Sequence, residues 1–159
     1  MIITRYNAAG TIERCLRSLR VQRTDRCYEV IGVDRCQHDT ARRAREDFPE
    51  VRLLTFATRK YCGEARNRGI PRALGRVVAF TDADGIVAED WVERVCLAHE
   101  EEHLAIGGSI ANGPSPSLVA WAACFCEFSQ WMPGLPAVAA GIDRMGVWRM
   151  CRLPERNPP

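Results

Sequence analysis

Two carboxylates stand one residue apart where an apolar stretch of the chain ends, in the sequence Val77-Val78-Ala79-Phe80-Thr81-Asp82-Ala83-Asp84-Gly85. The apolar stretch is typical of a fully buried strand, and a glycine follows the acidic pair. Two like charges this close repel each other unless a cation lies between them. Carboxylate oxygens suit a hard divalent metal, which proteins often bind together with substrate phosphates. The pair therefore predicts a metal and a phosphorylated ligand at the carboxyl edge of a parallel sheet.

Strands and helices alternate along the first two thirds of the chain. Runs of β-branched and apolar residues predict strands at residues 2–4, 28–33, 51–56, directly before Asp82, and at 104–110. Helical periodicity predicts helices after Thr11, after Asp39 or Thr40, from about Glu64 to Pro71, around residues 91–96 and at 118–132. Such alternation indicates an α/β fold, a three-layer and mostly parallel sheet with helices on both faces.

Polar residues follow several of the expected strands. Thr4, Asp34 and Asp82 all lie at or just after a strand end, and ligands of parallel sheets bind beyond the carboxyl ends of the strands. We therefore expect the three residues to meet at one edge. The alternative for Asp34 alone is a turn or helix cap.

Composition excludes several classes of protein. The 159 residues suffice for one domain with a real core, and a formal net charge of +2 is too small to indicate nucleic acid as a partner. We expect neither a signal peptide nor a membrane helix, because no apolar run approaches about 20 residues. The 8 cysteines contain no Cys-x-x-Cys pair, so reduced thiols are favoured over a zinc site.

Four motifs resemble those of glycosyltransferase family 2. Residues 2–16 are similar to the opening of that family, 28–34 to its second strand with an acidic end, 63–70 to the start of its central helix, and Asp82-Ala83-Asp84 to its metal-binding Asp-x-Asp. The motifs occur in the family's order over roughly residues 1–110. The resemblance implies a GT-A fold and a transferase that moves a sugar, with inversion, from a nucleotide-diphosphate donor to a sugar, lipid or protein acceptor.

The resemblance also implies roles for single residues. It assigns the nucleotide sugar to Thr4, Tyr6, Asp34, Arg66 and Asp82, and the metal, Mg²⁺ or Mn²⁺, to Asp84 and Asp82. Tyr6 would stack on the nucleobase, and Arg66 would reach the base or a phosphate. Taken singly, Tyr6 could cover the sheet edge and Arg66 could pair with a nearby carboxylate.

The second part of the chain matches the family less well. We expect a family domain over residues 1–132, with the nucleotide-binding half at 1–110, an apolar helix at 115–132, and an irregular or truncated tail at 133–159. The helix either packs as core or lies at an acceptor site or membrane interface. Glu127 on this helix is the candidate catalytic base, and its alternative is a surface carboxylate.

These residues support three hypotheses about function. The first is a metal-dependent glycosyltransferase domain in the cytoplasm or on the inner membrane face. The second is a degenerate or truncated module that binds nucleotide and metal without transfer. The third is a scaffold that has lost its ligand, and the acidic pair argues against it.

Overall fold

The computed structural model describes residues 1–5, 10–34, 45–56, 58, 61–100, 105–113, 117–135 and 150–152. For Arg5, Asp34 and residues 150–152 it describes the backbone alone. The chain divides into two compact units. The first comprises residues 1–106 and 149–159, and the second comprises residues 107–148.

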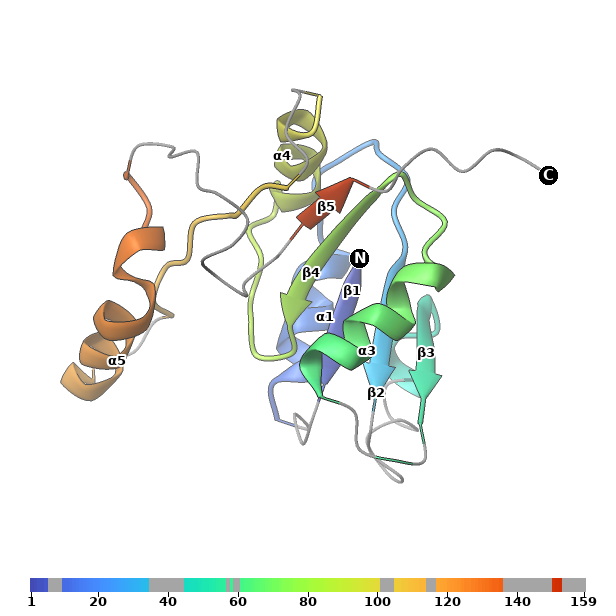
Figure 1. Cartoon of the computed structure of the whole chain (residues 1–159), viewed down its shortest axis with the longest axis horizontal. Helices are drawn as coiled ribbons and strands as arrows, with labels where there is room; N and C mark the ends of the chain where they lie inside the picture. The colour runs from blue at the N-terminus through green and yellow to red at the C-terminus, as the bar shows by residue number, and fades with distance from the viewer. Residues whose placement is uncertain are drawn as a thin grey trace. The chain divides into compact units, whose positions relative to one another are not determined.

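The first unit is built on a sheet of parallel strands with one antiparallel edge strand (Figure 1). Its strands are β1 (Ile2–Arg5), β2 (Val30–Asp34), β3 (Val51–Thr55), β4 (Val77–Asp82) and β5 (Met150–Arg152). They lie in the order β3-β2-β1-β4-β5, and only β5 runs antiparallel to its neighbour. The expected α/β class with a mostly parallel sheet is confirmed.

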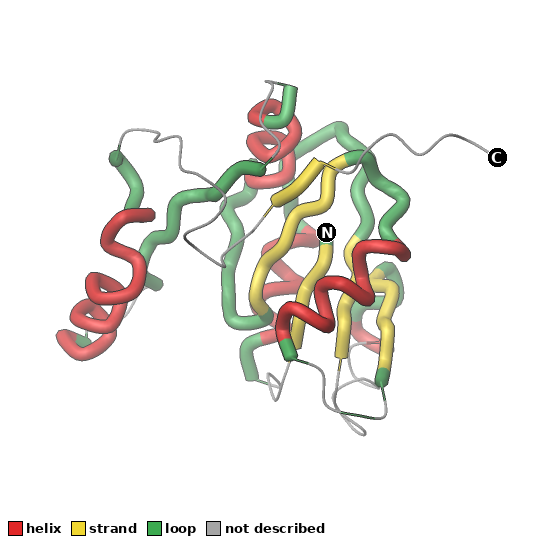
Figure 2. Tube along the Cα trace, in the orientation of Figure 1, coloured by secondary structure: helices red, strands yellow, loops and turns green. Residues whose placement is uncertain are grey.

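Helices cover both faces of this sheet. They are α1 (Ile12–Arg20), α3 (Cys62–Gly69), the short 3-10 helix η1 (Ile70–Arg72) and α4 (Trp91–Ala98). In Figure 1, α3 lies in front of the sheet and α1 behind it, and Figure 2 shows the same layers by type of element.

Alternation of side chains along β1 explains the two layers. Ile3 packs with the α1 residues Cys15, Leu16 and Leu19, whereas Ile2 packs in a separate cluster with Ala65 of α3. Both isoleucines have no exposed surface. Burial of apolar side chains on both faces is what a parallel sheet requires, and it holds the strand ends in register.

Two expectations about elements are wrong. Residues 106–110 form no strand, although the sequence 104–110 predicts one. The outer edge of β4 is paired instead by β5, which comes from the tail that was expected to be irregular. Alternating apolar and polar residues show that a segment can form a strand. They do not show which segment pairs with a given edge of the sheet, and this explains both errors.

Helix boundaries agree more closely with expectation. Pro71 lies in η1, directly after α3 ends at Gly69, as its missing amide predicts. Thr11 occupies the N-cap position of α1, but its side chain makes no capping hydrogen bond. Residues 45–47 are helical, while the expected start of that helix lies outside the described residues.

The second unit contains α5 (Leu118–Phe128) and the 3-10 helix η2 (Ser129–Trp131). The Ser117 hydroxyl accepts a hydrogen bond from the Ala120 amide and so caps α5. The Ile110 amide donates to the Trp131 carbonyl at 2.6 Å. In the part of the chain that the structure describes, no helix has both the length and the apolar character needed to cross a membrane.

Candidate functional site

Three strands bring their carboxyl ends to one edge of the sheet. Thr4 of β1 pairs with Asp82 of β4, and Arg5 pairs with Asp34 of β2. At backbone level the expected meeting of Thr4, Asp34 and Asp82 is therefore confirmed. The strand order changes direction between β1 and β4, because β2 and β3 lie on one side of β1 and β4 on the other. Such a switch point is where open α/β sheets bind their ligands.

The acidic pair follows β4 in a tight turn at this switch point. Ala83 between the two carboxylates is only 5% exposed and packs in the α1 cluster. Asp82 keeps 44% of its side chain exposed, and Asp84 is exposed. The Gly85 amide donates to the Asp82 carbonyl at 3.0 Å and closes the turn. A buried alanine thus anchors two carboxylates that remain accessible to a ligand.

Arg66 brings a positive charge to the same turn. Its Nη2 lies 3.0 Å from Oδ1 of Asp82, and its guanidinium carbon lies 5.5 Å from the centre of the Phe80 ring. The Arg66 side chain is 18% exposed. Among the described residues, nothing accepts a hydrogen bond from its buried Nε. The cation therefore pairs with one carboxylate while a further donor lacks an acceptor.

Thr4 contacts the first turn of α3. Its side chain is buried, and Oγ1 lies 3.2 Å from Sγ of Cys62, with either atom able to donate. Because α3 follows β3 in the chain, its first residues lie beside the strand ends (Figure 1). This contact and the Arg66 ion pair together join α3 to β1 and β4 at the edge.

Cys15 of α1 lies beneath the acidic turn and is fully buried. Its Sγ lies 3.5 Å from the Asp82 carbonyl oxygen and donates to it. Burial, and then the negative charges of Asp84 and Asp82, raise the pKa of this thiol to about 12. The thiol therefore stays protonated at neutral pH and supports the turn as a hydrogen-bond donor. All cysteines of known state in the described residues are free thiols, as expected (Cys15, Cys27, Cys62, Cys96, Cys124 and Cys126).

For three of the sequence-predicted site residues, the structure gives no side-chain position beside the acidic pair. Tyr6 lies outside the described residues, and of Asp34 only the backbone is described. Glu127 lies on α5 in the second unit with an exposed side chain. Their roles remain predictions.

The donor set fits a hard divalent cation. In the described ranges, no three His, Cys, Asp or Glu side chains gather closely enough to hold a metal ion by themselves. Mg²⁺ sites commonly use one or two carboxylates and complete the shell with substrate phosphates and water. Asp82 and Asp84 supply such a pair, and the buried Nε of Arg66 offers a donor to an anionic oxygen beside it. The residues present therefore fit a metal that binds together with a diphosphate.

Two residues that were not predicted from the sequence, Ser18 and Gln22, touch the segment after the acidic pair. Ser18 is buried on the apolar face of α1, where its hydroxyl accepts from the Val87 amide at 3.2 Å. Gln22 follows the end of that helix and donates to the Ala88 carbonyl at 2.7 Å. The signal was available, because a polar residue on an otherwise apolar helix face needs a hydrogen-bond partner.

Comparison with known proteins identifies relatives of this arrangement. The family model described as glycosyl transferase family 2 matches residues 1–138. The glycosyltransferase YibD of Escherichia coli is 34% identical over 160 aligned positions, which cover 92% of this chain and 43% of YibD. The succinoglycan biosynthesis protein ExoO of Rhizobium meliloti is 36% identical over 96 residues, which cover 59% of this chain and 27% of ExoO. The chain thus spans less than half the length of these relatives.

Solved structures share the fold. S. aureus TarS 1-349 in complex with UDP superposes with a TM-score of 0.63 at 22% identity, over 74% of this chain and 36% of that one. The mannosyltransferase PcManGT from Pyrobaculum calidifontis, in complex with GDP-Man and Mn²⁺, superposes with a TM-score of 0.59 at 26% identity, over 69% of this chain and 34% of that one. Both are GT-A fold transferases, so the expected fold family is confirmed.

Proposed function

The chain belongs to glycosyltransferase family 2, and from that membership we propose that it binds a nucleotide-diphosphate sugar through a divalent metal and transfers the sugar with inversion. One observation carries the proposal. The Asp82-Ala83-Asp84 turn lies at the switch point of the sheet, with Arg66 paired to its first carboxylate. The acidic pair offers negative charge to a metal, and the arginine of α3 beside it offers positive charge to a diphosphate.

In the proposed complex, Asp84 and Asp82 would hold Mg²⁺ or Mn²⁺. The metal supplies Lewis-acid stabilisation of the charge that develops on the leaving group. Arg66 donates from its planar fork to a phosphate oxygen, where its buried Nε would gain the acceptor that it lacks. Thr4, Tyr6 and Asp34 would contact the base and ribose of the donor.

Inversion requires a single displacement at the sugar. The acceptor hydroxyl gives its proton to a base, its oxygen bonds to the anomeric carbon, and the bond to the diphosphate breaks with its electron pair on the departing nucleoside diphosphate. Glu127 is the proposed base, since a carboxylate accepts a proton and no covalent protein intermediate is needed. The step needs no redox partner.

The relatives suggest the chemistry of donor and product. PcManGT binds GDP-Man and Mn²⁺, so a GDP-linked sugar with Mn²⁺ is the first donor to try, followed by UDP-linked sugars. The name of ExoO refers to succinoglycan biosynthesis, which favours a polysaccharide acceptor. We place the reaction in the cytoplasm or on the inner membrane face, where nucleotide sugars would be available.

A second candidate is a module that binds nucleotide and metal without transfer. It is favoured by one observation: the Glu127 side chain is exposed on α5, as expected of a surface carboxylate. Incubation with GDP-mannose or UDP-glucose and candidate acceptors separates the two. Acceptor-dependent release of nucleoside diphosphate supports transfer, whereas binding without release supports the module.

Calorimetric titration of GDP and UDP, with and without Mn²⁺, tests the shared premise. We expect binding that depends on Mn²⁺ in the parent chain and a loss of roughly 10- to 100-fold in Asp84→Ala. Asp25→Ala, which removes an exposed carboxylate elsewhere, is the control and should bind like the parent. If the parent binds neither nucleotide under either condition, nucleotide-sugar use is excluded.

A further inference from the structure

The segment between β4 and α4 carries Asp84 but has no regular structure of its own. After the turn at Asp82–Gly85, residues 85–88 lie in neither a helix nor a strand, and α4 begins at Trp91. Figure 1 shows this segment in yellow-green, leading from the arrowhead of β4 to α4. Because no strand ladder or helix holds these residues, contacts with other elements must set the position of the Asp84 carboxylate.

One face of α1 and the residues just after it supply these contacts. Cys15, Ser18 and Gln22 follow one another at spacings of three and four, which places them on one side of a helical path. Cys15 Sγ donates to the Asp82 carbonyl at 3.5 Å, and the Val87 amide donates to Ser18 Oγ at 3.2 Å. The three side chains therefore follow the segment from the acidic turn toward α4.

The Ser18 hydroxyl donates one hydrogen bond and accepts another. It donates to the Cys15 carbonyl at 2.7 Å and accepts from the Val87 amide, and the side chain is buried. Removal of the hydroxyl would leave the Val87 amide without this acceptor in a site that water reaches poorly. An unsatisfied buried donor is costly, so the segment would have to move to recover a bond.

Gln22 holds the far end of the segment with both ends of its amide. Nε2 donates to the Ala88 carbonyl at 2.7 Å and to the Ser18 carbonyl at 2.9 Å, while Oε1 accepts from the Val92 amide at 2.8 Å. The Arg23 amide adds a bond to the Glu89 carbonyl at 2.6 Å.

Apolar contacts act in the same direction. Ala83 belongs to the buried cluster of α1, and Val87 and Trp91 pack against that cluster. Every fourth residue from Ala83 to Trp91 thus packs an apolar side chain against the α1 cluster.

We propose that Ser18 and Gln22 are positioning residues for the metal-binding turn: they fix the segment that follows it and so set the place of the Asp84 carboxylate. This inference rests on the proposed function, since it concerns the same metal. It assigns a role in ligand binding to two side chains that touch neither the metal nor the donor.

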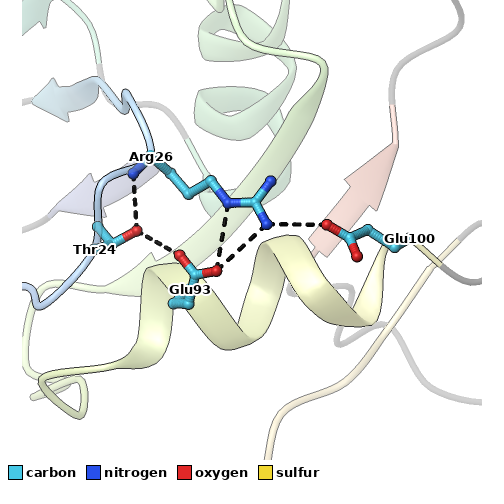
Figure 3. Close-up of polar contacts among 4 residues, drawn as sticks. All are labelled: Thr24, Arg26, Glu93 and Glu100. Atoms are coloured by element: carbon cyan, nitrogen blue, oxygen red, sulfur yellow. Dashed lines mark hydrogen bonds and ion pairs between the residues drawn. The ribbon is translucent and has the colours of Figure 1, made fainter.

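Thr24 provides a matched control. Its hydroxyl accepts from the Arg26 amide at 3.0 Å and donates to Glu93 at 2.7 Å, and Arg26 continues to Glu93 and Glu100 (Figure 3). This network joins the loop after α1 to α4, and none of these hydrogen bonds goes to residues 83–90. Ser18→Ala and Thr24→Val each remove one bridging hydroxyl, but only the first releases the segment.

The test measures Mn²⁺ alone, titrated into the full chain and followed by the electron paramagnetic resonance of the free ion. We expect about tenfold weaker Mn²⁺ binding in Ser18→Ala, because the hydrogen bond that holds the Val87 amide is lost, and parental affinity in Thr24→Val. Hydrogen exchange should accelerate at residues 85–92 in Ser18→Ala and not in Thr24→Val. Gln22→Leu is the second variant, with the same expectation, should Ser18→Ala fail to fold.

The outcomes separate the two proposals. A parent chain that binds no Mn²⁺ and no nucleotide overturns the proposed function, and the positioning role falls with it. A parent that binds Mn²⁺, with Ser18→Ala and Gln22→Leu as tight as Thr24→Val, overturns the positioning role alone.

Discussion

At the scale of single residues, Arg66 and the proposed metal would compete for the carboxylate of Asp82. Arg66 pairs with Asp82 in the structure, and the proposed divalent cation would need the same carboxylate. The exposed 44% of the Asp82 side chain leaves a face on which a cation can approach. In the ligand-free protein, Arg66 therefore forms the ion pair with a nearby carboxylate that its sequence position also allowed. This ion pair does not prevent Arg66 from binding a phosphate when the ligand is present.

Replacement of Arg66 by glutamine should separate these two roles. Loss of the positive charge frees Asp82, so Mn²⁺ alone should bind up to about fivefold tighter, the scale of a partly exposed ion pair. Nucleoside diphosphate with Mn²⁺ should bind at least about tenfold weaker, because a charge-assisted hydrogen bond is removed. Calorimetry of both ligands measures the two effects.

Arg68→Gln is the control for that experiment, since Arg68 lies exposed on the same helix. It should alter neither affinity. If Arg66→Gln weakens Mn²⁺ and nucleotide alike, the arginine supports the turn structurally and does not compete with the metal.

At the scale of elements, α1 and α3 hold the edge from opposite faces of the sheet. Cys62 and Arg66 reach Thr4 and Asp82 only because α3 approaches β1 closely. Gly69 permits that approach, since a Cβ at this position would lie 2.9 Å from Cγ2 of Ile2 and 3.3 Å from Cγ2 of Val33. A contact below 3.0 Å forces the buried isoleucine or the helix to shift.

Gly69→Ala should therefore lower the free energy of unfolding by about 1–3 kcal/mol, the usual cost of overpacking a core. Gly63→Ala on the same helix is the comparison, because a Cβ added at Gly63 would meet nothing within 4 Å. Alanine there should be neutral or should stabilise by up to about 1 kcal/mol through helix propensity. Urea unfolding of both variants checks the difference, and equal effects would show that α3 is not close-packed at Gly69.

At the scale of the whole molecule, the chain returns to the sheet after its second unit. Residues 149–159 group with the first unit, and β5 pairs Val77–Ala79 of β4 along an edge that would otherwise expose backbone groups. The first unit, which carries the acidic pair, is therefore completed by residues distant in sequence.

The stability of the folded chain should fall at alkaline pH through Cys15. The pKa of this thiol rises from its ordinary value of 9.0 to about 12 on folding. Below about pH 9 the thiol is neutral in both states, whereas above it the unfolded chain ionises first, so stability is lost as pH rises. Between about pH 8 and about pH 10 this loss amounts to about 1 kcal/mol.

Cys15→Ser provides the comparison, because serine keeps a donor toward the Asp82 carbonyl and does not titrate in this range. Urea unfolding at the two pH values should show a smaller alkaline loss in Cys15→Ser than in the parent, and other titrating groups cancel between the two proteins. An equal loss would mean that the folded thiol ionises at its ordinary pKa.

Much of the candidate site follows from local sequence. The apolar run before Asp82, the glycine after Asp84 and the alternation of strands and helices predict a carboxylate pair at the edge of an α/β sheet, because burial and turn chemistry act over a few neighbouring residues. Thr4 and Asp34 were placed on the same edge by that reasoning, and their register with Asp82 and Arg5 agrees.

Only the tertiary structure decided which distant groups meet. That β5 borders β4, that Arg66 pairs with Asp82, and that Ser18 and Gln22 bond to the segment after Asp84 all depend on contacts between residues far apart in sequence. Local sequence does not predict such contacts, because many segments can pair with a free edge of the sheet and many carboxylates can form an ion pair with an arginine. The acidic pair was therefore determined by sequence, and the elements that hold it were determined by packing.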